Sequence, residues 1–360
     1  MTAITLADQL LQHNLTPPQA NHEDWCYYDV SRVLATPLTQ AVAKPHREVE
    51  PNTLYFFNDT CVWGALDPAI TVTKQAAPPI ASTQNPFVQL KKDVTIQLEC
   101  QQFNGDITLI YEADGYQSSD VTLTGTDSTV RVHRRFINTQ KSLQNNQLAC
   151  HLTPGTSVTI VDTNAQNKGA ILDFMDVYVS QNAVFKAINT AVLCANARFQ
   201  SRVYLNQETA QATLHGLSIN GCGDQSFYNT HVHHNAPNTQ SRQLFKSLNK
   251  NDSVFEYNGK VSVAPKAQQI DSYQLNQNII LDEYAAVHSR PQLFIEADDV
   301  QCSHGSTTGD IPSDALFYLN SRGLNPLVSR SLLLKAFIQD VLTFAGDDTA
   351  AIMDGLDHII

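Results

Sequence analysis

The sequence predicts a mainly β protein with its strands in the middle of the chain and its helices at the two ends. Three observations support this class. Short β-branched runs separated by Gly, Asn, Asp or Pro recur from about residue 86 to 300. Charged residues make up only 16% of the chain, and Asn, Gln, Thr and Ser replace them, as in stacked β-structure with polar ladders. After residue 310 the apolar residues recur at helical spacing.

The first predicted region, residues 1–75, is helical. "LADQLLQH" places Leu6, Leu10 and Leu11 on one helical face, and "HEDWCYYDVSRVL" places an apolar stripe behind two acidic residues. The Pro- and Ala-rich passage "KQAAPPIASTQNP" then indicates a connector to the next region.

The second predicted region, residues 76–305, contains runs such as "DVTIQLEC", "DITLIYEA", "SVTIVDT" and "GKVSVAP", which are typical of strands. Few helical patterns interrupt them, so the region does not consist of repeated strand–helix–strand units. The runs are irregularly spaced, and no clean repeat period is visible. The pattern by itself therefore leaves a sandwich, a large barrel and a solenoid open.

The third predicted region, residues 306–360, contains three helices. Ser313 is a candidate N-cap for "PSDALFYLNSRG", and Asn325 is one for "NPLVSRSLLLKAFIQDVLTF". Asp347 and Asp348 are expected to cap a short terminal helix. A tail of about 50 residues is too small to bury all of its apolar faces, so it must dock on the β-region or on a partner.

The charge balance and the missing motifs exclude several function classes. The chain has 23 basic and 35 acidic residues, a net charge of −12, and no basic stripe, which disfavours nucleic acid and anionic membranes as partners. The start of the sequence lacks the pattern of a signal peptide, and no stretch has the ~20 apolar residues of a membrane span. Seven scattered Cys residues, none in a C-x-x-C pair, indicate reduced thiols in a cytoplasmic protein. Neither a phosphate-binding loop nor a G-x-S-x-G motif is present, so we expect no bound nucleotide.

Two motifs resemble reactive sites but have simpler interpretations. In "HVHH", an extended strand would point His231 and His233 the same way, as in a metal-ligand pair. No third ligand follows at motif spacing, and His215 would qualify only from a neighbouring rung, so we interpret the pair as part of a polar ladder. "GCGD" at 221–224 is interpreted as a turn whose small residues allow close backbone approach.

The stretch "VQCSHGSTTG" contains the stronger candidate. If it is extended, Cys302 and His304 face the same side, so they could hold one metal ion, or the imidazole could lower the thiol pKa. Two ligands do not close a stable metal site, because structural zinc and iron–sulfur centres normally use four. The remaining ligands would come from another chain, a neighbouring rung or inorganic sulfide. A plain strand end stays open as the alternative.

The long stretch that contains this pair resembles a known family. Residues 274–324 read "QLNQNIILDEYAAVHSRPQLFIEADDVQCSHGSTTGDIPSDALFYLNSRGL" and are similar to the C-terminal signature of the SufB/SufD family of iron–sulfur cluster assembly scaffolds. The family elements are a Pro-x-Leu-x-Ile strand, Ala-Asp-Asp-Val, Cys-Ser-His-Gly and a Leu-Phe-Tyr-Leu-x-Ser-Arg-Gly helix. "HVHHNAPNTQSRQLFKSLNKNDSVFEYNGKVSV", with Tyr257-Asn258 inserted before the glycine, and "HEDWCYYDV", with Cys26 at the usual lysine position, are weaker matches. The modest length and the Ser-Thr-Thr-Gly after the histidine fit the SufD branch.

The resemblance implies a fold, partners and a site. It implies a right-handed parallel β-helix with small helical N- and C-terminal regions, and a scaffold, not an enzyme, that pairs with SufB. It also implies that the C-terminal helices bind the SufC ATPase, for which we select Leu334, Phe337 and Ile338 as candidate contacts. His304 would face a SufB cysteine where the nascent iron–sulfur cluster assembles transiently, with Cys302 beside it.

Two other functions compete with this one. A carbohydrate-active β-helix enzyme would need export and a set of acidic residues on one face. A SufB-like scaffold could instead act as a homodimer, and a homodimer is also possible for the isolated chain.

Overall fold

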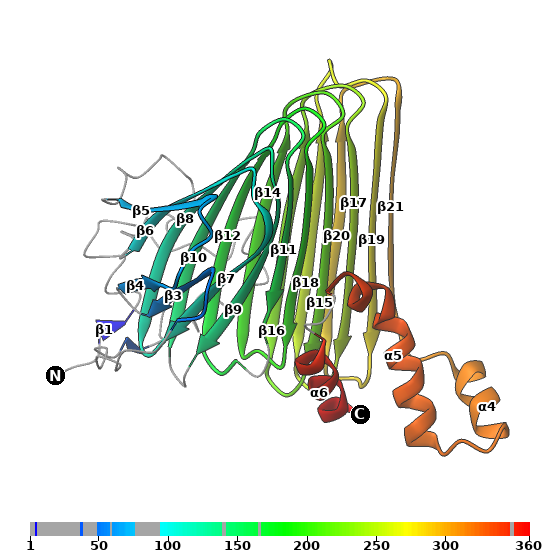
Figure 1. The fold of residues 1–360 in the computed structure, drawn as a ribbon. Coiled ribbons are helices and arrows are strands. Elements are labelled where there is room, and N and C mark those ends of the chain that lie inside the picture. Colours follow the sequence, from blue (N-terminus) through cyan, green and yellow to red (C-terminus); the bar gives the residue numbers. More distant parts are fainter. Residues whose placement is uncertain are drawn as a thin grey trace.

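The protein is a parallel β-helix built from two long sheets (Figure 1). The computed structural model describes residues 4–5, 37–38, 49–57, 60–75, 94–138, 142–164, 167–345 and 349–360. From β6 (Val94–Gln101) onward the strands alternate between the two sheets along the chain, so that two consecutive strands make one turn, or rung, of the helix. Among the three architectures that the pattern left open, the solenoid is confirmed.

Each sheet takes every second strand of the solenoid. The 9-stranded sheet consists, in spatial order, of β20 (Ala286–Ile295), β18 (Val254–Val263), β16 (Gln225–His234), β14 (Asn196–Leu205), β12 (Ala170–Val179), β10 (Leu143–Leu152), β8 (Tyr116–Thr126), β6 (Val94–Gln101) and β5 (Ile70–Gln75). The 10-stranded sheet consists of β21 (Val300–Gly309), β19 (Ile270–Ile280), β17 (Gln240–Asn249), β15 (Gln211–Asn220), β13 (Val184–Val192), β11 (Ser157–Thr163), β9 (Thr129–Asn138), β7 (Asn104–Ala113), β3 (Thr53–Phe57) and β4 (Thr60–Trp63). At the N-terminal side each sheet ends in an antiparallel pair, β5 with β6 or β3 with β4. β1 (Ile4–Thr5) and β2 (Pro37–Leu38) form a separate antiparallel pair.

The core lies between the two sheets, where alternate residues of every strand point inward. In-register pairing stacks like positions from rung to rung, as in the column that contains Val121, Leu148 and Met175, all of them buried. Parallel pairing of this kind requires tight corners between rungs. Asn182, Asn238 and Asn251 supply left-handed backbone there, with φ of 55°, 57° and 58°. Asn tolerates this conformation better than most residues do, which explains the Asn-rich turns.

The strands are longer than the sequence pattern indicated, and the N-terminal part differs from expectation. Most strands have about ten residues. The sequence pattern looked shorter because buried polar side chains interrupt the apolar alternation by which a strand is recognised. Residues 53–57, 60–63 and 70–75, placed in the helical region by the sequence, form β3, β4 and β5. The helices expected around 6–13 and 22–34, and most of the expected connector, fall outside the described residues. β21 continues to Gly309, past the expected boundary at 305.

Three helices follow the last rung: α4 (Ser313–Ser321), α5 (Pro326–Ala345) and α6 (Ala350–Ile359). Asn325 caps α5 as predicted, since its side-chain Oδ1 accepts the N–H of Val328 at 2.9 Å. α4 begins at Ser313 itself, so this residue is not its N-cap. The predicted caps Asp347 and Asp348 lie outside the described residues. No helix in the described part of the chain is long and apolar enough to span a bilayer.

α5 and α6 pack on the outer face of the 10-stranded sheet, as Figure 1 shows for the end of the chain. A second apolar core lies between these two helices and the sheet. It includes Val161, Ile188, Val192, Leu217, Ile219, Leu248 and Ile279 of the sheet and Leu334, Ile338, Val341, Leu342, Ile352, Leu356 and Ile359 of the helices. Cationic side chains from the sheet bind the helix carboxyl ends. Lys250 Nζ donates to the carbonyl of Ile359 at 2.7 Å, and Arg131 donates to that of Ala345 at 3.2 Å. Both contacts complement the negative end of a helix dipole.

Candidate functional site

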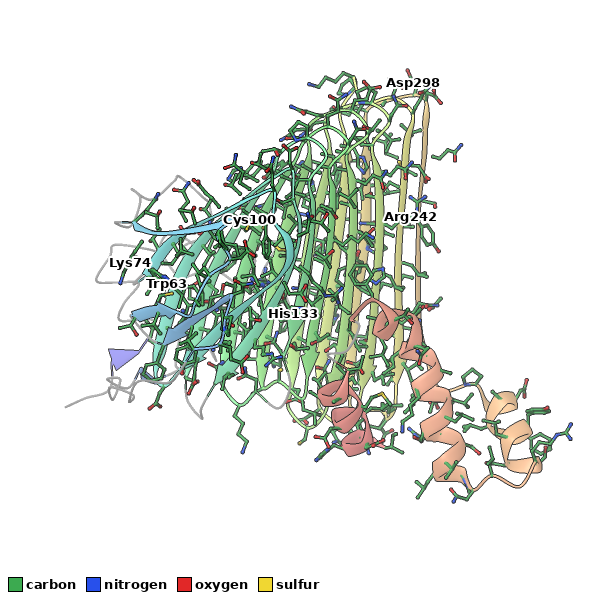
Figure 2. The ribbon with its side chains drawn as sticks, in the orientation of Figure 1. Trp63, Lys74, Cys100, His133, Arg242 and Asp298 are labelled. Atoms are coloured by element: carbon green, nitrogen blue, oxygen red, sulfur yellow. The ribbon has the colours of Figure 1, made fainter. Side chains whose placement is uncertain are left out.

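β20 and β21 are the last strands at one end of the two sheets. The rung that they form is called the terminal rung below. Each of these strands pairs with one neighbour, β18 or β19, and presents its other edge outward among the described residues. Figure 2 shows Asp298 in the turn that joins the two strands. Phe294 is 51% exposed and Ile295 is 39% exposed on β20. Long unprotected parallel edges with exposed apolar residues are typical of a surface that another chain covers.

Cys302 and His304 both lie on the interior-facing side of β21. Their in-register neighbours on β19 are Ser272 and Gln274, which are 1% and 0% exposed. Cys302 is half-buried and packs against the main apolar core, whereas His304 is exposed at the open end of the rung. The two side chains therefore share one face, as the extended stretch predicts, and that face is open toward a covering chain.

The environment of Cys302 favours the thiol over the thiolate. Burial raises its pKa above the usual value, the carboxylate of Asp271 raises it further, and a hydrogen bond with the backbone of Ser272 acts in the opposite direction. A positive charge such as iron would reverse this preference, because coordination deprotonates a thiol. In the chain by itself, Cys302 is therefore a half-buried thiol with a raised pKa.

The two positions continue columns that run through the rungs below. Ser241-x-Gln243 on β17 and Ser272-x-Gln274 on β19 stand directly under Cys302-x-His304. The Ser column is hydrogen-bonded, with 2.8 Å between the Oγ atoms of Ser241 and Ser272. It ends at the buried His234, whose Nε2 lies 2.9 Å from Ser241 Oγ. The candidate pair therefore lies at the end of a polar strip of the interior. The repeated spacing Ser-x-Gln, Ser-x-Gln, Cys-x-His is the feature of the sequence that corresponds to this strip.

The opposite strand of the terminal rung reaches the same region. Ser289 on β20 and Ser306 on β21 approach each other across the interior, with their hydroxyl oxygens 2.8 Å apart. Val287 and Leu293 of β20 pack against the main core. The β20 wall at this end thus carries Val287, Leu293 and the hydroxyl of Ser289, and the β21 wall carries the thiol, the imidazole and the hydroxyl of Ser306.

The other histidine candidates do not gather around a metal ion. His231 and His233 face the same side of β16, with ring centroids 3.7 Å apart, and His231 Nε2 lies 2.7 Å from Ser262 Oγ. His233 also stacks on Tyr204, as part of an aromatic ladder on the outer face. His215 is on the other sheet, against Phe344 of α5. No group of three or more potential His, Cys, Asp or Glu ligands occurs in the part of the chain that the structure describes.

"GCGD" forms a turn, as expected. Gly223 has a φ of +70°, which explains the glycine, and Cys222 is exposed. The carboxylate of Asp252, through a hydrogen bond and its charge, raises the pKa of the Cys222 thiol.

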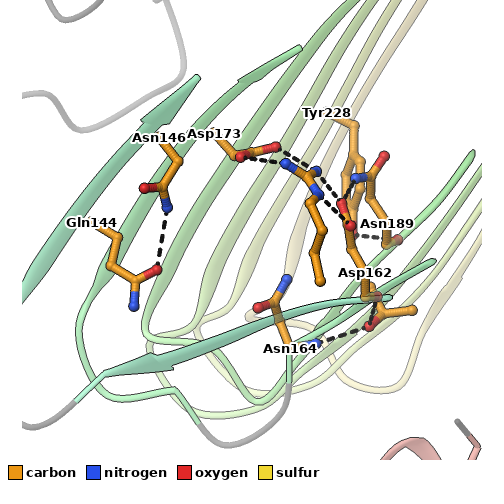
Figure 3. Close-up of polar contacts among 9 residues, drawn as sticks. Gln144, Asn146, Asp162, Asn164, Asp173, Asn189 and Tyr228 are labelled. Atoms are coloured by element: carbon orange, nitrogen blue, oxygen red, sulfur yellow. Dashed lines mark hydrogen bonds and ion pairs between the residues drawn. The ribbon is translucent and has the colours of Figure 1, made fainter. Parts of the chain in front are cut away.

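Sequence reasoning missed a charged cluster inside the solenoid (Figure 3). Arg134, fully buried, binds the carboxylates of Asp162 and Asp173, with 3.0 and 2.9 Å to the two oxygens of Asp173. Asn189 also donates to Asp162. One guanidinium serves two buried carboxylates, and burial raises the pKa of Asp162 to about 6 despite that partner. The alternation of Val132, Arg134 and Phe136 on β9 was the signal, since it places the arginine on the inward phase.

The α4–α5 hairpin presents apolar side chains to solvent. Phe317 is 75% exposed, Tyr318 57%, Leu327 67% and Leu332 49%. In Figure 1 this hairpin projects away from the sheets. Exposed large apolar residues grouped on one projecting element indicate a docking surface.

Two of the three candidate partner contacts selected from the sequence are buried in the protein's own core. Leu334 and Ile338 are 0% exposed, because they pack between α5 and the sheet in the second core. Phe337 is half-buried, and Lys246 Nζ lies over its ring at 4.6 Å. Helical periodicity identified the apolar face of α5, and that face covers the β-helix itself.

Comparison with known proteins agrees with this geometry. A family model described as "SUF system FeS cluster assembly, SufBD core domain" matches residues 92–337. The Escherichia coli (strain K12) iron–sulfur cluster assembly protein SufD is 32% identical over 151 residues, which are 42% of this chain and 36% of that protein. A SufBD family protein of Synechocystis is 40% identical over 108 residues (30% and 24%), and the chloroplastic protein ABCI7 of Arabidopsis thaliana is 38% identical over 109 residues (29% and 22%).

The matches to these relatives span little more than a third of their length at most. The family model, by contrast, covers most of this chain and includes the terminal rung and the start of the helical tail. The fold, the terminal rung and the family model lead to the same conclusion. The chain belongs to the SufBD core family of SUF-system iron–sulfur cluster assembly proteins.

Proposed function

We propose that this chain is a non-catalytic, cytoplasmic scaffold subunit that pairs with a SufB-type chain and receives a nascent iron–sulfur cluster at the shared interface. The observation that carries the proposal is the position of His304 and Cys302 on the interior face of the terminal rung. Two ligands make a weak site by themselves. A second chain that adds thiolate or sulfide would complete it.

The open edge supports pairing with another β-helix. β20 and β21 offer ten residues each, so a partner with similar strands would continue both sheets at the ~4.8 Å strand spacing. The exposed Phe294 and Ile295 would be covered in the process. The E. coli relative carries the name SufD, and the SufD branch was the better fit to the sequence.

The projecting hairpin supports a second contact, with the SufC ATPase. α5 is fixed to the β-helix through its buried face, whereas Phe317, Tyr318 and Leu327 remain exposed. A partner ATPase would also supply the nucleotide hydrolysis for which this chain has no motif. We therefore assign SufC to the hairpin surface and not to Leu334 and Ile338.

The test is the His304→Ala variant in a complex co-expressed with SufB and SufC. We expect normal complex formation but a sharp decrease in iron content, sulfide content and visible absorption, because an exposed imidazole contributes a metal ligand and little stability. Cys302→Ser should have a smaller effect, since the resemblance to the family implies a position opposite the SufB thiol more firmly for the histidine than for the cysteine. Ser303→Ala is the matched control, because Ser303 lies between the two residues and faces the other side of the strand.

Full cluster loading in the His304→Ala complex would contradict the proposal. The isolated chain offers a second measurement: formation of a homodimer that holds as much iron as the SufB complex would favour a homodimeric scaffold instead.

A further inference from the structure

Gln274 is the residue directly beneath His304 in the interior. The two are register partners on adjacent strands, β19 and β21, so their backbones lie one strand spacing, ~4.8 Å, apart. Gln274 is 0% exposed, between Ser272 and Asn276 on the inward phase of its strand. An amide at this position can reach the ring of a residue one rung above it.

Neither polar atom of the Gln274 side chain has a hydrogen-bond partner in the structure. A buried amide that stays unpaired costs about 1–3 kcal/mol, and native interiors rarely contain one without a reason. Its neighbours on β19 behave differently. Ser272 bonds to Ser241, and Asn276 donates to the carbonyl of Phe245 at 3.1 Å. Among these three inward-facing polar residues of β19, Gln274 is the one whose side chain makes no hydrogen bond.

Gln243, the residue below Gln274, cannot satisfy all of the hydrogen-bonding capacity of the Gln274 amide. The Oε1 atom of Gln243 already accepts hydrogen bonds from Thr230 Oγ1 at 2.7 Å and from Tyr257 Oη at 3.3 Å. Only Nε2 of Gln243 is available, as a donor, to the Oε1 of Gln274. A carbonyl oxygen has two lone pairs, so Gln274 Oε1 can accept a second donor from above.

We infer that Gln274 is a positioning residue for His304: its Oε1 accepts the N–H of one imidazole nitrogen and so leaves the other nitrogen free to bind iron. This inference rests on the proposed function of His304. The imidazole is exposed in the isolated chain, but a chain that covers the terminal rung would remove it from water, and its N–H would then need an acceptor. Metal-bound histidines generally donate their second nitrogen to such an acceptor, which fixes tautomer and ring orientation.

The experiment compares Gln274→Leu with Gln274→Glu in the complex with SufB and SufC, using Co²⁺ as the probe metal together with iron and sulfide content. Gln274→Leu should weaken Co²⁺ binding about tenfold or more, the usual effect of removing such a support. It should not lower the urea midpoint of the chain, because it replaces an unpaired buried amide with an apolar group. Gln274→Glu keeps a carbonyl acceptor and should retain most of the binding. Ser272→Ala, equally buried and beneath Cys302, is the control for any change in the column.

The outcomes separate this inference from the proposed function. Normal Co²⁺ affinity and cluster content in Gln274→Leu, with loss in His304→Ala, would overturn the positioning role and leave the scaffold function standing. Loss of Co²⁺ binding in both Gln274→Leu and Gln274→Glu would show that the shape of the amide matters and not its acceptor oxygen. That result would also overturn the positioning role. Full loading in His304→Ala would remove the proposed function itself.

Discussion

At the scale of single residues, the fold holds two histidines in their neutral form. His215 lies beneath α5, where its pKa is lowered to about 4: burial is the main cause, the charge of Asp340 opposes the shift, and the charge of Lys246 adds to it. Its ring contacts Phe344 at 4.4 Å between centroids, and its Nδ1 is buried without a partner. Burial likewise lowers the pKa of His234, to about 4, with both ring nitrogens at hydroxyl groups. A group whose folded-state pKa is lowered gives stability that is present above its unfolded pKa, near 6.5, and lost as the pH falls toward 4.

His215→Phe should therefore stabilise the protein, and more so in acid. At pH 7.5 the gain comes from removing an unpaired buried nitrogen. At pH 5 it should grow by on the order of 2 kcal/mol, because the wild-type ring must stay neutral in the folded state while it takes up a proton in the unfolded state. Urea unfolding at the two pH values measures the difference.

Val161→Ala is the control for this measurement. Val161 lies in the same helix-covered core and does not titrate, so its cost should be equal at both pH values. An advantage of His215→Phe that is the same at pH 7.5 and pH 5 would show that the histidine is protonated as easily in the folded state as in the unfolded one.

At the scale of elements, the C-terminal tail divides into a part that serves the fold and a part that does not. α5 and α6 cover an apolar sheet face, and α6 approaches β13 so closely that a Cβ at Gly355 would meet Val192 Cγ1 at 2.0 Å. α4 and the first turns of α5 instead carry the exposed apolar side chains Phe317, Leu327 and Leu332. Removal of the whole tail would expose the second core, so surface substitutions are the cleaner test of partner binding.

Phe317→Ser combined with Leu327→Ser should abolish co-purification with SufC and leave the unfolding free energy within about 0.5 kcal/mol of wild type, because both side chains are mostly exposed. Leu334→Ala is the control with the opposite expectation. It should lower the free energy of unfolding by about 2–5 kcal/mol and, while the chain stays folded, retain SufC binding. Pull-down with tagged SufC and urea unfolding give the two readouts. SufC binding by the double variant would place the contact elsewhere on the chain.

At the scale of the whole molecule, the solenoid has an open end that a second chain can continue. Leu293 lies on the interior side of the terminal rung, half-buried against the core. A lysine there could extend its ammonium group through the open end of the isolated chain. In a complex that covers this end, the same charge would be buried at a considerable cost.

Leu293→Lys should therefore weaken association with SufB at least tenfold, equivalent to about 1.4 kcal/mol, while the variant chain remains folded by circular dichroism. Gln292→Lys, the adjacent position on the outer side of the same strand, should associate normally. Sedimentation of the mixed chains measures both affinities. Equal association of the two variants would mean that SufB does not cover the interior of the terminal rung.

The sequence by itself determined the class of the fold and the family, and it predicted that the candidate pair shares one face of a strand. Strand-forming runs, Asn-rich turns and helical spacing after residue 310 are local properties, and Cys302 and His304 share a face because an extended strand alternates with a period of two. The number of residues per strand was not accessible, since buried Asn, Gln and Ser break the apolar pattern wherever they pair across rungs.

Only the tertiary structure decided which residues meet across rungs. That Gln274 stands in register with His304, and that Arg134 binds Asp162 and Asp173, depends on the pairing between strands about a rung apart in the chain. The same holds for the tail: Leu334 and Phe317 are both apolar helix residues, and only packing against the sheet buries one and exposes the other. Burial is a property of neighbours, and in a solenoid the neighbours come from other rungs.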